Sequence, residues 1–167
     1  MYTSNPPMTL DPAKSYQATV VTAKGNIVLA LYPKSAPLAV NSFVFLARQG
    51  YFDHTTFHRV LAGFMAQGGD PTGTGGGGPG YQFVNEIDPA LKFDSAGVLG
   101  MANAGADTNG SQFFITYAAA SWLDGGYTIF GRLTAGMDVL KSLTERDPSK
   151  GPTFVGDEIL TIEIEEK

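Results

Sequence analysis

The sequence predicts a mainly β domain, built as a barrel or a sandwich and covered by two helices. Eight short segments are rich in β-branched and aromatic residues, and only two stretches carry a helical period. The chain of 167 residues contains no internal repeat and no linker, which suits one domain. We expect an irregular N-terminal lead-in over residues 1–14 and a single domain over residues 15–167.

The first two predicted strands form a hairpin. Residues 16–22 and 25–31 are rich in Val, Ile, Leu and Thr, and Lys24-Gly25 between them can form a tight turn. The last strand, residues 158–164, alternates in the way that a strand with one buried face should. Five more strands are predicted between them, over residues 55–61, 64–68, 97–101, 112–116 and 128–133.

Two segments have the period of an amphipathic helix. Apolar residues recur at helical spacing over residues 38–49, with Pro37 suited to the first turn and Gly50 just past the last. Residues 135–144 carry a second apolar stripe of this kind. Each helix is expected to place its apolar face on the core.

Composition excludes several classes of function. The chain has no cysteine, so disulfides, thiolate nucleophiles and cysteine-bound metals are excluded. The net charge is −5 and no run of Lys or Arg is present, which disfavours nucleic acid or an anionic membrane as a partner. The first ten residues do not resemble a signal peptide, so we expect a cytoplasmic protein.

No metal or cofactor is expected. Thr55, Thr56 and Phe57, between His54 and His58, favour an extended strand. Four residues of strand place the two histidine Cα atoms ~13 Å apart, too far for easy shared ligation. The glycine run over residues 73–78 lacks a following Lys-Ser or Lys-Thr and a βαβ setting, so it does not predict a phosphate site.

Arg59 is the main candidate for chemistry. It lies in a segment of apolar and β-forming residues, where it is either the partner of a carboxylate or a fixed donor aimed at a ligand. A guanidinium presents five donors in a rigid fork and cannot act as a general base. Apolar residues in neighbouring segments are either core or the walls of a pocket, namely Phe64, Met65, Phe114 and Leu123. An apolar pocket with one arginine and neutral amides nearby suits an amide-containing ligand better than a phosphate.

Three segments resemble the cyclophilin family. They are F-H-R-V-L-A-G-F-M-A-Q-G-G-D over residues 57–70, M-A-N-A-G-A-D-T-N-G-S-Q-F-F over residues 101–114, and W-L-D-G from Trp122. The similarity runs from about Tyr16 to Ile164. It implies a closed eight-stranded antiparallel β-barrel capped by two α-helices, with proline isomerisation at a groove on the outside of the barrel.

The resemblance also implies roles for individual residues. Arg59 matches the catalytic arginine, which hydrogen-bonds to the prolyl nitrogen. Trp122 matches a position that contacts cyclosporin in the family, so binding of that inhibitor is expected. Tyr127 stands where many members carry histidine, which puts the outline of the groove there in doubt. The implied substrate-binding residues are Phe64, Met65, Phe114 and Leu123 for the proline ring, Gln67 and Asn103 for the peptide backbone, and Ala102, Ala104, Gln112, Trp122 and Tyr127 for the rest of the groove.

These observations predict a peptidyl-prolyl cis-trans isomerase that acts on X-Pro bonds of proline-containing peptides and unfolded proteins and so assists folding. We expect it to be a monomer that binds neither nucleic acid nor membrane. The alternative is a proline-peptide binding module or chaperone with little turnover. Catalysis on a short proline peptide, measured beside affinity for the same peptide, separates these two.

Overall fold

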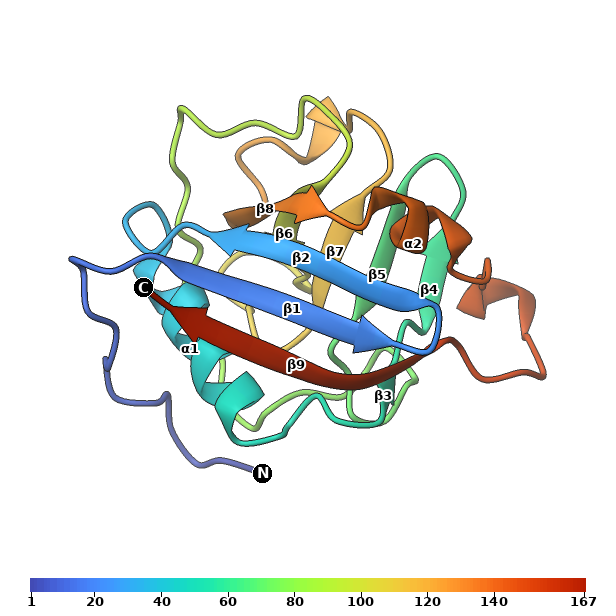
Figure 1. The fold of residues 1–167 in the computed structure, drawn as a ribbon, viewed down its shortest axis with the longest axis horizontal. Coiled ribbons are helices and arrows are strands. Elements are labelled where there is room, and N and C mark those ends of the chain that lie inside the picture. The colour runs from blue at the N-terminus through green and yellow to red at the C-terminus, as the bar shows by residue number, and fades with distance from the viewer.

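Nine strands, two α-helices and two short 3₁₀ helices make up the computed structural model, which describes residues 1–167 (Figure 1). The elements in chain order are β1 (Tyr16–Thr22), β2 (Gly25–Leu31), α1 (Pro37–Arg48), β3 (Thr55–Thr56), β4 (Arg59–Leu61), β5 (Met65–Gly68), β6 (Val98–Met101), β7 (Phe113–Thr116), η1 (Ser121–Leu123), β8 (Ile129–Ala135), α2 (Met137–Ser142), η2 (Pro148–Lys150) and β9 (Glu158–Glu166).

All nine strands belong to one antiparallel sheet in the order β3-β9-β1-β2-β8-β6-β7-β5-β4. The mainly β fold with two helices is therefore confirmed, while the count of eight strands is approximate. One predicted strand, residues 55–61, divides into β3 and β4, which form the two edges of the sheet. Phe57 and His58 connect β3 to β4. The two edges of the sheet are therefore linked through the backbone and not by a ladder of hydrogen bonds.

The interruption between β3 and β4 has a local cause. Phe57 and His58 are buried, and their backbone groups bond outside the ladder. The Phe57 amide donates to the Asp157 carbonyl at 2.9 Å, and Arg146 Nη1 donates to the His58 carbonyl at 2.7 Å. Because these partners come from the segment before β9, the chain changes direction between the two strands.

The main core lies on the inner face of the curved sheet and contains 28 buried residues. Opposed residues of an antiparallel ladder share one face. One inner row crosses four strands, from Val60 through Ala66 and Ile115 to Leu99, and each of these side chains is at most 2% exposed. Packed phenylalanine rings fill much of the remaining volume, including Phe43, Phe52, Phe113 and Phe130.

Helix α1 follows its predicted bounds closely and buries its apolar face against this core. Helix α2 is shorter than predicted, because Ala135 belongs to β8 and Gly136 separates the strand from the helix. Gly136 has a φ of 92°, and a Cβ there would overlap the Asn26 carbonyl oxygen, so only glycine fits this junction. No helix has the length and apolar run needed to cross a bilayer.

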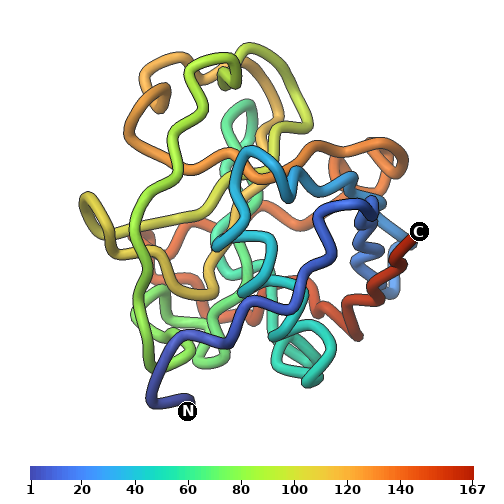
Figure 2. The backbone as a smooth tube through the Cα atoms, turned by 90° about the vertical axis from the view of Figure 1, so that its left-hand side faces the viewer, coloured from blue at the N-terminus to red at the C-terminus, as the bar shows by residue number.

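The N-terminal lead-in contains no helix or strand, yet it packs on the domain. The amide of Thr9 donates to Asn41 Oδ1 at 3.0 Å, and Asn41 Nδ2 donates to the Pro7 carbonyl at 3.0 Å. The Asp11 amide donates to the Tyr16 hydroxyl at 2.7 Å. Figure 2 shows this blue segment running across the molecule beside the cyan residues of α1.

We expect Phe113→Ala to lower the free energy of unfolding by about 3–5 kcal/mol, because the change leaves a cavity among the rings of the core. Phe113 is fully buried and contacts the rings of Phe43, Phe52 and Phe57. Urea denaturation at pH 7 measures the effect. Val155→Ala, at a side chain that is 78% exposed, is the control and should change stability by less than about 0.5 kcal/mol. Equal effects of the two changes would contradict this description of the core.

Candidate functional site

The outer face of the sheet carries a row of predicted site residues. Arg59 on β4 pairs with Gln67 on β5, Gln67 pairs with Phe114 on β7, and Phe114 pairs with Gly100 on β6. Since opposed residues point to the same side, this row lies opposite the inner row that ends at Leu99. The guanidinium is therefore not directed into the main core, and it shares a face with the Phe114 ring.

A second apolar cluster lies on this outer face, separate from the main core. Its buried members are Met65, Phe93, Val98, Phe114, Ala120, Leu123 and Ile129. Phe64, Ala102, Tyr127 and Leu61 are partly buried and pack against it. All four residues predicted to hold a proline ring thus meet in one cluster, although they come from the β4–β5 turn, β5, β7 and η1.

Phe114 is at the centre of this cluster. Its ring stacks on Phe93 with a centroid separation of 5.6 Å, and Tyr127 packs edge-on at 5.9 Å. Gly100 makes room for the ring, because a Cβ at Gly100 would lie 2.6 Å from Phe114 Cζ. Neither Phe93 nor Gly100 was predicted as a site residue. Phe93 lies outside the three motifs, and Gly100 carries no side chain that could signal a role. Tyr127 itself is partly buried and packs on this cluster, but it does not line the cavity described below.

Trp122 lies at the surface beside the cluster. Its side chain is 70% exposed, and its ring lies 5.6 Å from the ring of Phe64, between centroids. It is the only tryptophan of the chain. An exposed indole next to an apolar cluster offers a contact surface to a ligand, and it also provides a fluorescence signal at the candidate site.

Arg59 forms no ion pair with any carboxylate of the chain, which removes the interpretation of a structural salt-bridge arginine. Its Nη1 instead donates to Gln67 Oε1 at 3.5 Å. Gln67 Nε2 donates to Gln112 Oε1 at 2.9 Å. Arg59 as a residue is partly exposed, and its guanidinium retains donors that no protein group uses.

Gln112 connects this polar chain to the glycine loop, residues 70–80. Its Nε2 donates to the Gly75 carbonyl at 2.9 Å and to the Gly77 carbonyl at 3.0 Å. The fully buried Asp70 carboxylate holds the loop from inside by accepting from the amides of Gly75 and Gly77 and from Thr72. Glycine here serves a loop that wraps around a carboxylate, since a Cβ at Gly77 would overlap Asp70 Oδ1.

Asp70 is held ionised by these contacts. Burial raises the pKa of its carboxyl, but hydrogen bonds from Thr72, Gly77 and Gly75 outweigh that effect and leave the pKa below its usual value. The carboxylate form therefore stabilises the folded loop.

A cavity of about 680 Å³ lies next to the apolar cluster. Five predicted site residues line it: Gln67, Ala102, Asn103, Ala104 and Gln112. Ala102 also packs on the apolar cluster, so the two parts of the site are contiguous. The remaining lining comes from Met1, the glycine loop, Tyr81, Gln82, Thr108, Gly110 and Ser111, none of which sequence analysis assigned to the site.

The loop before β7 is fixed by its own hydrogen bonds. Asn103 Nδ2 donates to the Gly126 carbonyl at 3.1 Å, and Asn103 Oδ1 accepts from the Gly105 amide at 3.1 Å. The Ala104 amide donates to Thr108 Oγ1 at 2.8 Å. The main-chain groups of Asn103 and the carbonyl of Ala104 have no side-chain partner, and they border the cavity.

The two histidines differ in solvent exposure and in hydrogen bonding. His54 is exposed, and its Nδ1 is 2.5 Å from Glu158 Oε1. His58 is 1% exposed, and burial lowers the pKa of its imidazole. Its Nδ1 has no hydrogen-bond partner.

A single antiparallel sheet with an arginine and an apolar cluster on its outer face, next to a cavity, defines a β-sheet protein with a candidate site at its surface. The chain belongs to the family "Cyclophilin type peptidyl-prolyl cis-trans isomerase/CLD", whose sequence model matches residues 17–164. Its enzyme class is accordingly that of the peptidyl-prolyl cis-trans isomerases.

Relatives and solved structures agree with this assignment. The chain is 54% identical over 138 residues to "Peptidyl-prolyl cis-trans isomerase-like 1" of Mus musculus, covering 81% of either chain, and 53% identical over the same length to that of Homo sapiens, with the same coverage. A cyclophilin type isomerase of Cryptosporidium parvum, solved in the presence of the dipeptide Ala-Pro, has a TM-score of 0.82 and 40% identity, covering 89% of this chain and 98% of its own.

We expect the contribution of Asp70 to stability to depend on pH. Because the folded pKa lies below the ordinary value of 3.8, the contribution is fully present above about pH 5 and is lost as pH falls through the folded value. Asp70→Asn should therefore destabilise the protein by about 1–3 kcal/mol at pH 7, since it leaves a weaker acceptor for buried amides. Urea denaturation of both proteins at pH 7 and at pH 3 should show the difference shrinking at the lower pH.

Asp94→Asn, at an exposed carboxylate, is the matched control and should show a small difference at both pH values. A loss of stability in Asp70→Asn that is the same at pH 3 and pH 7 would show that Asp70 acts by shape and not by charge.

Proposed function

We propose that this groove catalyses rotation about X-Pro bonds by directing the Arg59 guanidinium at the prolyl nitrogen while the apolar cluster holds the proline ring. The observation that carries the proposal is the position of Arg59. It shares the outer face with Phe114, and it has no carboxylate partner.

The reaction needs no nucleophile, metal or redox group, because no covalent bond is broken. The peptide bond resists rotation by ~18–20 kcal/mol through its partial double-bond character. At X-Pro the cis and trans forms are close in energy, but exchange takes roughly tens to hundreds of seconds. A site accelerates exchange by stabilising the twisted state, and each tenfold in rate requires about 1.4 kcal/mol.

Arg59 can supply stabilisation that is specific to the twisted state. Twisting removes conjugation, so the prolyl nitrogen gains a lone pair that accepts a hydrogen bond, whereas the planar amide nitrogen does not. A fixed donor next to that nitrogen therefore binds the transition state more strongly than the ground state. Gln67 Oε1, at 3.5 Å from Arg59 Nη1, orients the guanidinium without neutralising it.

The apolar cluster supplies the second requirement, which is to keep one side of the bond still. Met65, Phe114 and Leu123 are each at most 7% exposed, so their side chains are held by packing before a ligand arrives. A pyrrolidine ring placed on them gains apolar burial without ordering new side chains. Phe64 and Trp122, further out, complete the surface over which the ring would lie.

The cavity side of the groove would bind the part of the peptide that rotates. Its walls offer neutral donors and acceptors, among them Asn103 and Gln67, and no charged side chain. Neutral groups suit peptide amides of any sequence, which fits unfolded chains as substrates and an assisting role in folding. Support for a proline peptide as ligand comes from the Cryptosporidium parvum relative solved in the presence of Ala-Pro. The exposed Trp122 ring is consistent with cyclosporin as an inhibitor.

We expect Arg59→Ala to lower the exchange rate of a bound proline peptide by about 100-fold or more, the usual effect of removing one oriented transition-state donor. Folding stability and peptide affinity should change little, because Arg59 has no ion pair to lose. Magnetisation-exchange NMR on an Ala-Pro-containing peptide measures turnover, and Trp122 fluorescence on the same samples measures binding.

Arg132→Ala, at an exposed arginine on β8, is the control and should leave both quantities unchanged. Near-normal exchange in Arg59→Ala would refute the proposed role of the guanidinium. Peptide binding by the wild-type protein without measurable exchange would instead identify a proline-peptide binding module.

A further inference from the structure

One residue outside the predicted site binds the free edge of β4, the strand that carries Arg59. β4 is three residues long and lies at the end of the sheet, where β5 is its only neighbouring strand. On the other side, the Val60 amide donates to the Arg146 carbonyl at 2.8 Å, and the Arg146 amide donates to the Val60 carbonyl at 2.9 Å. Arg146 thus pairs with this edge as a neighbouring strand would, at the residue next to Arg59.

The Arg146 side chain continues along the same edge. Its Nη1 donates to the His58 carbonyl at 2.7 Å, so one residue binds main-chain groups on both sides of Arg59. A short edge strand without such a partner would leave these groups unpaired. Bound by Arg146, they fix the chain immediately before and after the Arg59 Cα.

The guanidinium of Arg146 is itself held in one orientation. Its Nε donates to the Phe154 carbonyl at 2.9 Å, and the group lies over the Phe154 ring, 5.8 Å from the centroid. Arg146 forms no ion pair with any carboxylate of the chain. A guanidinium presents its donors in a rigid fork, which a lysine ammonium cannot reproduce. Two carbonyl acceptors on this fork therefore join β4 to the loop before β9.

Arg59 depends on this support because its own side chain has little. The one hydrogen bond of its guanidinium, from Nη1 to Gln67 Oε1, is 3.5 Å long, at the limit for such a bond. The position of the guanidinium therefore follows mainly from the position of the backbone that carries it. A displacement of about 1 Å in a group that acts on the reacting atoms can lower a rate by about 100-fold.

We propose that Arg146 is a positioning residue of the isomerase, which holds the edge of β4 so that the Arg59 guanidinium stays directed at the groove. Arg146 belongs neither to the cavity lining nor to the apolar cluster, so its effect on catalysis passes through Arg59. This inference rests on the proposed function, since it assumes that Arg59 is the group that acts on the X-Pro bond.

Arg146→Ala tests the side chain alone. It removes the bonds to the His58 and Phe154 carbonyls but keeps the main-chain pair with Val60, so the variant should fold. We expect exchange of a bound Ala-Pro-containing peptide, measured by magnetisation-exchange NMR, to slow by about fivefold or more, with peptide affinity within about twofold of the wild type. Arg146→Lys keeps the charge but not the fork and should slow exchange by a similar factor.

A double-mutant cycle separates positioning from a general loss of structure. In an Arg59→Ala background, Arg146→Ala should change the residual exchange by less than about 1.5-fold, because no guanidinium is left to position. The order of the Arg59 side chain gives a second readout, which does not depend on activity. The nitrogen–proton heteronuclear NOE of its Nε–Hε group should be lower in Arg146→Ala than in the wild type.

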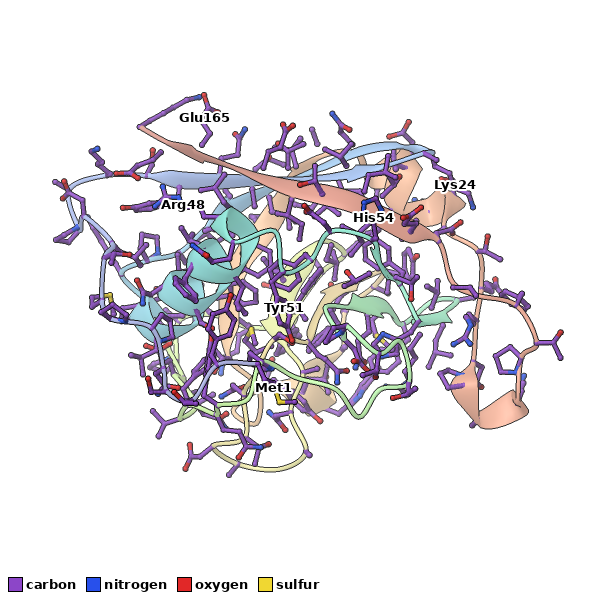
Figure 3. The ribbon with its side chains drawn as sticks, turned by 90° about the horizontal axis from the view of Figure 1, so that it is seen from below. Met1, Lys24, Arg48, Tyr51, His54 and Glu165 are labelled. Carbon is purple, nitrogen blue, oxygen red and sulfur yellow. The ribbon has the colours of Figure 1, made fainter.

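Arg48→Ala is the matched control. Arg48 Nη2 donates to Glu166 Oε2 at 2.6 Å, so this variant also loses an arginine and its hydrogen bond. Figure 3 shows Arg48 on the cyan helix α1, at the opposite end of the molecule from the pale orange loop that carries η2. The exchange rate and the NOE of Arg59 should therefore stay at their wild-type values.

Exchange at the wild-type rate in Arg146→Ala would overturn the inference. So would an equal fold loss with and without the Arg59 guanidinium, or an unchanged NOE of Arg59, because Arg146 would then act on the fold as a whole. Near-normal exchange in Arg59→Ala alone would instead refute the proposed function, and the NOE would still show whether Arg146 orders that side chain. The two failures are therefore distinguishable.

Discussion

The strict alternation of side chains across β4, β5, β7 and β6 is the constraint on which the site depends. One row of opposed residues, from Val60 to Leu99, is buried in the main core, and the next row places Arg59 beside Gln67 and Phe114 on the outer face. Moving any of these strands by one residue would exchange the two rows. Burial of the inner row therefore fixes the register, and the register places the guanidinium at the groove.

Packing and polar contacts then hold in place the side chains that the register puts on the outer face. Phe114 is held between Phe93 and Tyr127, and Gly100 leaves space for its ring. On the polar side, the hydrogen bonds run from the Arg59 guanidinium through two glutamines to the carbonyls of a loop wrapped around Asp70. The apolar side of the groove is thus rigid through packing, whereas the polar side depends on a chain of neutral hydrogen bonds ending at a buried charge.

Much of this was predictable from sequence, for identifiable reasons. Period-two and helical patterns placed β1, β2 and α1 within one residue, because each is a regular element with one buried face. The three motifs together identified residues that the structure brings together from four separate segments, the β4–β5 turn, β5, β7 and η1. The break at Phe57 and His58 was not predictable, since it follows from contacts with residues near 146 and 157. Gly100 and Phe93 were missed for the same reason: their roles exist only after distant segments meet.

The central claim is that an arginine without a carboxylate partner lies next to an apolar surface that holds proline. A crystal structure of the protein with a bound Ala-Pro-containing peptide tests it most directly. The account predicts the pyrrolidine ring in contact with Met65 and Phe114 and an Arg59 nitrogen within about 3.5 Å of the peptide group of the X-Pro bond. A proline bound elsewhere, or an Arg59 side chain turned away from a proline seated on Phe114, would contradict it.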